Sequence, residues 1–360
     1  MAGLVVQFPT NVSLDRVIQE YMVQKDELIG IKEVMPFEDQ ETQIVEWDVL
    51  DNLKGLTAAH TLGADPVMGQ RRGSRTRRYD PLFWKQQELI REDEILRRRQ
   101  LGTLGNVVNI DSLVTRAAVD GIDLDYLRAE FLVWLSLANN GFTVNNNGVV
   151  VTETFAFQQF TAAVPWATFA TATPATNFNS LKPLARGTGG TLKGAKAYMN
   201  STTCSNLLQN ANPNDLFGLR GPSFATQTYS LEEVNKLLKS RNLPELVEYD
   251  EGYYDANGNF QTFIPDNVVV LKLRRPSGKG QEAGNIALTP SLHRIVGGKE
   301  APGFFAKIEV NGMAGAAAMG AATIDLEALG SSANPRISVF HGWYGGPISR
   351  YQRSFIIMHV

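Results

Sequence analysis

Cysteine and histidine are scarce in this sequence. Cys204 is the one cysteine among 360 residues, which excludes an intramolecular disulfide framework and a zinc site built from cysteines. We expect it to be a small buried or half-buried thiol, because free cysteines usually pack as small hydrophobes. The four histidines stand apart, without an HExxH motif or a His-x-His spacing, and we interpret them as surface or packing residues: His60, His293, His341 and His359.

The signatures of common catalytic sites are also missing. No GxSxG elbow presents a nucleophilic serine. The glycine-rich residues 187–190 lack the Gly-Lys-Ser/Thr ending that holds a triphosphate and its metal, so we interpret them as a loop. The acidic residues 92–94 are flanked by arginines, which favours a solvated or salt-bridged face over a cation site. We therefore predict no catalytic, cofactor-binding or metal-binding residues, and no enzyme activity.

The chain lacks a long apolar run and an excess of positive charge. Residues 312–330 are poor in charge, but they include Asp325 and Glu327 and their apolar residues are mostly small, so they do not qualify as a membrane-spanning helix. Residues 1–10 show no basic region followed by an apolar one, and no signal peptide is predicted. The net charge of −3 argues against a dedicated nucleic-acid binder. We expect a soluble globular protein that is cytoplasmic at synthesis.

The strongest helical signal lies at 111–140. Asp111 is a candidate N-terminal cap, apolar residues follow at helical spacing, and Asn139-Asn140-Gly141 is a C-terminal stop. Gly121 is a candidate position for a bend or for a division into two helices, with Asp123 as a second cap. A continuous helix of this length would span roughly 45 Å, which suits a backbone element.

The other predicted elements mix helices and strands without a regular βαβ alternation, which indicates an α+β fold. Helices are expected after Ser13, from Asn200 to Leu208, and after the capping box Ser230–Glu233. Strands are expected at 44–50, 246–254, 260–263, 268–273 and 354–360, with hairpin turns at 145–148 and 255–258. Residues 162–179, rich in Ala, Thr and Pro, are expected to be extended or a loop.

A cluster of five arginines is the most serious candidate for a binding site: Arg71, Arg72, Arg75, Arg77 and Arg78. Guanidinium groups bind phosphates and carboxylates bidentately, so the cluster has two interpretations. It contacts nucleic acid, or it contacts carboxylates of an adjacent subunit. Residues 1–60 hold eleven Asp and Glu against four Lys and Arg, and the cluster has no interleaved aromatics, so we favour the subunit contact.

Three segments occur in a recognisable order. A charged arm at 71–96, with Tyr79-Asp80-Pro81 near its tip, precedes the long helix. Residues 197–208 (AYMNSTTCSNLL) form a strand-then-helix step, and residues 253–271 (YYDANGNFQTFIPDNVVVL) form a hairpin that leads into an apolar strand. This order resembles the tailed-phage major capsid proteins of HK97-like fold, in particular the family of the lambda major head protein, capsid protein E. Residues 312–322 have no counterpart in it, and the sequence at 341–346 is unusual for it.

The resemblance implies an α+β, HK97-like major capsid fold divided into named parts. These are an N-terminal arm (1–45), an extended loop region (46–100), a peripheral domain (101–185 and 325–360) with a spine helix at about 111–140, and an axial domain (186–324). It also implies subunit contacts through the five arginines and Lys85. Some relatives link such a lysine covalently to an asparagine, but its partners are not identifiable here and no bond is predicted.

The resemblance implies that many copies of the chain, as hexamers and pentamers, form the icosahedral head shell of a tailed phage. Expected partners are portal and scaffold proteins, a decoration protein as a further candidate, and packaged double-stranded DNA bound without sequence specificity; no membrane is expected. The expected location is the virion, and the host cytoplasm during assembly. Two alternatives stay open: an encapsulin-like compartment of the same fold, and a nucleic-acid-binding protein that uses the arginine cluster.

Overall fold

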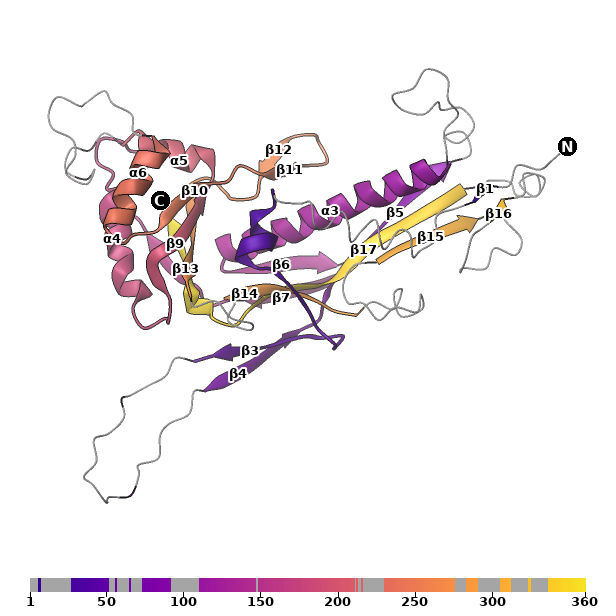
Figure 1. Cartoon of the computed structure of the whole chain (residues 1–360), viewed down its shortest axis with the longest axis horizontal. Helices are drawn as coiled ribbons and strands as arrows, with labels where there is room; N and C mark the ends of the chain where they lie inside the picture. The colour runs from indigo at the N-terminus through magenta and orange to yellow at the C-terminus, as the bar shows by residue number, and fades with distance from the viewer. Residues whose placement is uncertain are drawn as a thin grey trace.

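A long helix and a long strand run side by side through one half of the molecule, and a lobe of three helices around a sheet forms the other half (Figure 1). This computed structural model describes residues 6–7, 27–51, 56, 65, 73–91, 110–146, 148–210, 212, 215, 230–275, 283–290, 305–311, 323–324 and 336–360. The helix predicted after Ser13 lies, up to residue 26, outside the described residues, as do residues 92–94 and 312–322.

The helix predicted at 111–140 is confirmed as α3 (Ile110–Ala138). Gly121 does not divide it. A Cβ at Gly121 would lie 2.4 Å from Cδ2 of His341, so glycine is needed there because a strand approaches closely, and not because the helix ends. Nothing in the local sequence distinguishes these two reasons.

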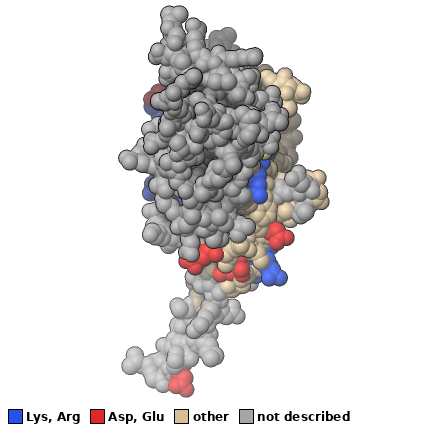
Figure 2. All heavy atoms as spheres, turned by 90° about the vertical axis from the view of Figure 1, so that its right-hand side faces the viewer, with Lys and Arg blue, Asp and Glu red and all other residues tan. Residues whose placement is uncertain are grey.

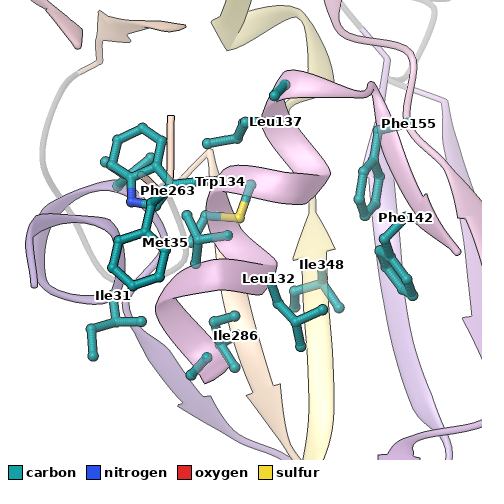
Figure 3. Close-up of a cluster of buried hydrophobic side chains, with 14 of the residues drawn as sticks. Ile31, Met35, Leu132, Trp134, Leu137, Phe142, Phe155, Phe263, Ile286 and Ile348 are labelled. Carbon is teal, nitrogen blue, oxygen red and sulfur yellow. The ribbon is translucent and has the colours of Figure 1, made fainter. Parts of the chain in front are cut away.

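The long strand is β17 (Arg336–Ser349), which organises the sheet below α3. The strand β5 (Leu82–Arg91) pairs with β17 in antiparallel orientation, from Arg336↔Arg91 to Gly345↔Leu82. The other strands of this sheet follow the order β15-β17-β14-β2: β2 (Phe37–Asp39), β14 (Gly284–Leu288) and β15 (Phe305–Asn311). Buried side chains of α3 pack against this sheet, as Figure 3 shows for Leu132 beside Ile348.

The second sheet has the strand order β10-β9-β13-β18-β8 and belongs to the lobe with the three helices. Its strands are β8 (Gln158–Thr161), β9 (Thr191–Met199), β10 (Glu245–Glu248), β13 (Val268–Arg274) and β18 (Phe355–His359). The helices are α4 (Pro174–Ala185), α5 (Ser201–Leu208) and α6 (Leu231–Ser240). The strands predicted at 268–273 and 354–360 are thereby confirmed.

The predicted helix start at Asn200 and the predicted capping box are both confirmed in this lobe. The Asn200 side chain accepts a hydrogen bond from the Thr203 backbone N–H at 2.9 Å at the start of α5. Ser230 and Glu233 form the reciprocal capping box at the start of α6. Both signals are local, so the sequence alone was sufficient to find them.

The loop predicted at 162–179 is wrong in its last part, where α4 begins at Pro174. Proline suits the first position of a helix because its fixed φ is helical and no N–H is needed there. Two N–H groups of the first turn bind Asp215, whose carboxylate accepts from Ala175 N at 2.9 Å and from Thr176 N at 3.1 Å. This capping residue lies forty positions further along the chain, beyond the reach of a local pattern.

Short antiparallel hairpins complete the described fold. They pair β3 (Val45–Leu50) with β4 (Ser74–Tyr79), β6 (Gly141–Asn146) with β7 (Val149–Thr154), and β11 (Gly252–Tyr254) with β12 (Phe260–Thr262). The last two pairs confirm the predicted hairpin turns. In addition, β1 (Val6–Gln7) pairs with β16 (Thr323–Ile324), and short π- and 3-10 turns lie at η1 (Gly30–Val34) and η3 (Gln352–Ser354).

The two sheets take strands from distant parts of the chain. β14 and β15, which fall in the segment predicted as axial, pair with β17. Conversely β18, from the segment predicted as peripheral, pairs with β13 in the other sheet. The assignment of named capsid domains to residue ranges stays a prediction, since strand pairing alone does not define those domains.

Candidate assembly surface

The β3–β4 hairpin projects from the body of the molecule, and its base is fixed by buried aromatic residues (Figure 1). Trp47 and Tyr79 lie on its inner face, where Trp47 Nε1 donates to the Ser349 carbonyl at 3.0 Å and Tyr79 Oη donates to the Pro347 carbonyl at 2.8 Å. Burial raises the pKa of Tyr79 well above its ordinary value, so the hydroxyl keeps its proton and remains a donor. The prediction that Tyr79 lies near the tip of the arm is wrong: it marks the base.

The exposed side chains of the hairpin carry charges of both signs. Where this hairpin leaves the body, Figure 2 shows acidic and basic side chains next to one another. Arg75 lies 3.7 Å from the Asp51 carboxylate, and Thr76 Oγ1 donates to Asp48 at 2.7 Å. Two acidic residues of the first sixty, Asp48 and Asp51, therefore contact β4 within one subunit. Exposed pairs of this kind contribute little to stability.

Arg77 differs from its neighbours because it is bound to another hairpin of the same chain. Its guanidinium donates to Glu153 Oε1 at 2.7 Å and to the Thr154 carbonyl at 2.6 Å. The Glu153 side chain is only 15% exposed, so this ion pair is better shielded than that of Arg75. Arg77 thus connects β4 to β7 and fixes the direction in which the β3–β4 hairpin projects.

We expect Arg77→Ala to lower the free energy of unfolding by about 1–2 kcal/mol, because it leaves a half-buried carboxylate and a carbonyl without their donor. Arg75→Ala is the matched control on the same strand and should change it by less than about 0.5 kcal/mol. Urea unfolding of both variants measures the difference. Equal losses in the two variants would show that the Glu153 contact does not hold the hairpin.

The other predicted contact residues are dispersed. Arg78 lies on β4 opposite Glu46, and Lys85 lies on β5 opposite Gly342; both are exposed and neither has an ion-pair partner among the described residues. Arg71 and Arg72 lie outside the described residues. Of the six predicted residues the structure describes four, three of them on β4 and Lys85 on β5, and the contact they make with a neighbouring subunit stays a prediction.

A groove of about 1540 Å³ opens between α3, β5 and the β11–β12 hairpin. In the described part of the chain the large hydrophobic side chains that are exposed are Ile44, Leu56, Phe83, Leu89, Leu124, Val150, Tyr254 and Phe260. Half of them line this one groove: Ile44, Phe83, Leu124 and Tyr254. A concentration of exposed apolar side chains in one concave surface marks an interaction site.

The walls of the groove are braced by aromatic contacts. The Arg128 guanidinium lies 4.6 Å from the centroid of the Trp84 ring, and Phe131 meets Tyr253 edge to face at 5.4 Å. Phe83 packs edge to face on Tyr344 at 4.9 Å. The apolar lining is therefore held in place before any partner binds. Sequence reasoning missed this groove, since its lining comes from segments that only the fold brings together.

Buried polar residues next to the groove are engaged with one another. His341 is fully buried and its Nδ1 lies 3.1 Å from Asp125 Oδ2, which confirms the packing interpretation for this histidine. Burial raises the pKa of Asp125, although the hydrogen bond with His341 acts to lower it. Among the described residues no group of three or more His, Cys, Asp or Glu side chains is placed to hold a metal ion. No helix in that same part of the chain is long and apolar enough to cross a membrane.

Residues 10–310 match the family described as phage major capsid protein E. The chain belongs to this family. Its fold is also similar to that of a candidate capsid protein of a prophage from Escherichia coli CFT073, with a TM-score of 0.58 and 14% identity over 98% of this chain and 99% of that one. A phage-related protein from Bordetella bronchiseptica RB50 gives a TM-score of 0.53 and 11% identity over 98% and 97%. No curated protein matches the sequence.

The predicted family and the predicted α+β, HK97-like capsid fold are thereby confirmed. The capsid protein is a structural shell subunit of a tailed phage. The segment at 253–271, one of the three that carried the resemblance, forms most of the β11–β12 hairpin and the first part of β13, so it contributes both to the groove and to the second sheet.

Proposed function

We propose that many copies of this capsid protein, arranged as hexamers and pentamers, form the closed icosahedral head of a tailed phage around double-stranded DNA. The family match supports this proposal, and the observation that carries it is the braced apolar groove. Burying such a surface against a neighbouring copy removes apolar area from water, and repetition around a closed shell makes the assembly stable.

In this arrangement the groove receives an apolar segment of the adjacent subunit. Arg78 and Lys85, which have no described partner, meet carboxylates of that neighbour, and Arg71, Arg72 and Arg75 contribute to the same contact. Opposite charges at the edge of an interface set register and association rate more than affinity. Their attraction weakens as salt rises, because mobile ions screen exposed charges.

The remaining parts of the proposal follow from a role in a phage head. Portal and scaffold proteins, and a decoration protein as a further candidate, bind the shell, and the DNA inside is held without sequence specificity. Assembly takes place in the host cytoplasm and the finished protein is in the virion. The subunit works by assembly alone, without a catalytic step.

Negative-stain microscopy of the purified protein tests the proposal directly. We expect closed or aberrant shells; a dispersed monomer at high concentration would contradict it. DNA inside particles from infected or induced cells supports a phage head, whereas an enzyme cargo would indicate an encapsulin-like compartment. A gel-shift with a salt titration tests the other alternative, since binding through phosphate contacts gives a steep dependence on salt.

The charged contact is tested by reversing the charge of the two predicted contact residues that have no ion-pair partner among the described residues, in the double variant Arg78→Glu with Lys85→Glu. We expect fewer shells at low ionic strength and a partial recovery at high ionic strength, because salt screens the new repulsion. Turbidity and microscopy across a salt series measure this. Assembly that is unchanged at every salt concentration would remove these two residues from the interface.

A further inference from the structure

Glu130 is a fully buried carboxylate in α3 that accepts hydrogen bonds from four donors. Its Oε1 accepts from Gly30 N at 2.7 Å, from Trp134 Nε1 at 2.7 Å and from Tyr249 Oη at 2.6 Å, and its Oε2 accepts from Ile31 N at 2.8 Å. Burial raises the pKa of this carboxyl, while the four hydrogen bonds act in the opposite direction. A buried carboxylate is expensive unless its lone pairs are satisfied, so these donors must stay in place.

The donors come from three separate parts of the chain. Gly30 and Ile31 begin the π-helical turn η1, Trp134 lies one turn along α3, and Tyr249 follows β10 of the second sheet. Glu130 therefore joins the turn, the long helix and the lobe at a single point. Ile31 and Met35 of the turn region belong to the same buried hydrophobic cluster as Trp134 (Figure 3).

The turn is shaped to fit the carboxylate. A Cβ at Gly30 would lie 2.5 Å from Glu130 Oε1, so no other residue allows this approach without a shift. The π-type hydrogen bond from Met35 N to the Gly30 carbonyl, at 2.7 Å, closes the turn. Single π-helical turns are rare and often lie at functional positions.

The same turn is bound a second time to the lobe. Glu33 Oε2 accepts from Lys196 Nζ at 2.5 Å and from Tyr198 Oη at 3.3 Å, and the Glu33 carbonyl accepts from Lys272. The hydrogen bond with Lys196 lowers the pKa of Glu33. Lys196 and Lys272 are direct cross-strand partners on β9 and β13, so one acidic residue bridges two like charges of the second sheet.

We propose that Glu130 and η1 form a latch that fixes the second lobe at one angle to α3. In a shell, this angle sets the curvature of the subunit, so an open latch gives shells of mixed size. Each sheet is held by its own strand pairs, so we expect opening the latch to change the relative position of the elements without unfolding either sheet. The effect on curvature rests on the proposed function, whereas the fixed angle is a property of the single subunit.

The test is Glu130→Gln, which keeps the shape of the side chain but turns one acceptor into a donor that faces other donors. We expect amide exchange at Gly30 and Ile31 to become at least tenfold faster, while exchange in β13 and in the middle of α3 stays the same. Shells of Glu130→Gln should vary in diameter. Glu232→Gln, the same change on the exposed face of α6, is the matched control and should alter neither readout.

Tyr249→Phe removes one donor and no charge, and it replaces Glu130→Gln if that variant does not fold. Exchange at Gly30 and Ile31 that stays slow would overturn the latch. If a variant with fast amide exchange at Gly30 and Ile31 still forms shells of uniform diameter, the latch does not set the curvature. If the unmodified protein forms no shells at all, the proposed function fails, and the exchange measurement alone decides whether the latch exists.

Discussion

Leu124→Glu is expected to leave a folded subunit that no longer assembles, with the assembled fraction lowered more than tenfold. Leu124 lies on the outer face of α3, 46% exposed and in the lining of the groove. Glutamate is a good helix former and gains an i,i+4 partner in Arg128, so the isolated subunit loses little. In an interface the new charge has to leave water, and its attraction to Arg128 offsets only part of this desolvation penalty, which is several kcal/mol at every repeated contact.

Val150→Glu is the matched control for this variant. Val150 is 60% exposed on β7, and it does not line the groove. Sedimentation and microscopy measure assembly, and thermal unfolding checks that both variants remain folded. If Leu124→Glu assembled as well as Val150→Glu, the groove would not be the surface that holds neighbouring subunits together.

Gly121→Ala is expected to destabilise the subunit by about 3 kcal/mol, although alanine is the better helix former by about 1 kcal/mol. The new methyl group would overlap the ring of His341, which is fully buried and has no room to withdraw. Moving the ring would also disturb the hydrogen bond to Asp125 inside the core. Urea or thermal unfolding measures the loss.

A double-mutant cycle with His341→Ala isolates the cause. Once the ring is gone, the methyl group has space, so Gly121→Ala should be neutral or should stabilise by about 0.5–1 kcal/mol in that background. The sign of the effect therefore reverses between the two backgrounds. A stabilising Gly121→Ala in the unmodified protein would mean that the helix and β17 are not in close contact at this position.

Signals confined to a few residues were read correctly from the sequence. The capping box at Ser230, the helix start at Asn200 and the turn at 255–258 each depend on hydrogen bonds between residues at most four positions apart. The helix at 111–140 was found for a similar reason, since its apolar stripe repeats within one element. The family resemblance was carried by the order of three segments, 71–96, 197–208 and 253–271, each of which is contiguous in the sequence.

The role of each arginine in the cluster could not be read in this way. Arg75, Arg77 and Arg78 are neighbours in sequence, but alternation along β4 and the position of β7 give only Arg77 a shielded partner, Glu153. A sequence pattern shows which charges are present. It does not show that Arg77 forms an ion pair with a residue 76 positions further along the chain. The prediction treated the arginines as one group for that reason.

The sequence by itself determined the α+β fold class, the long helix, the hairpins and the capsid family, because these depend on local hydrogen bonding and on a recognisable order of segments. Only the tertiary structure decided where the functional surfaces lie. The groove, the His341 contact with Gly121 and the Glu130 network bring together residues about 100 to more than 200 positions apart. Such contacts arise from the packing of whole elements, which no local pattern specifies.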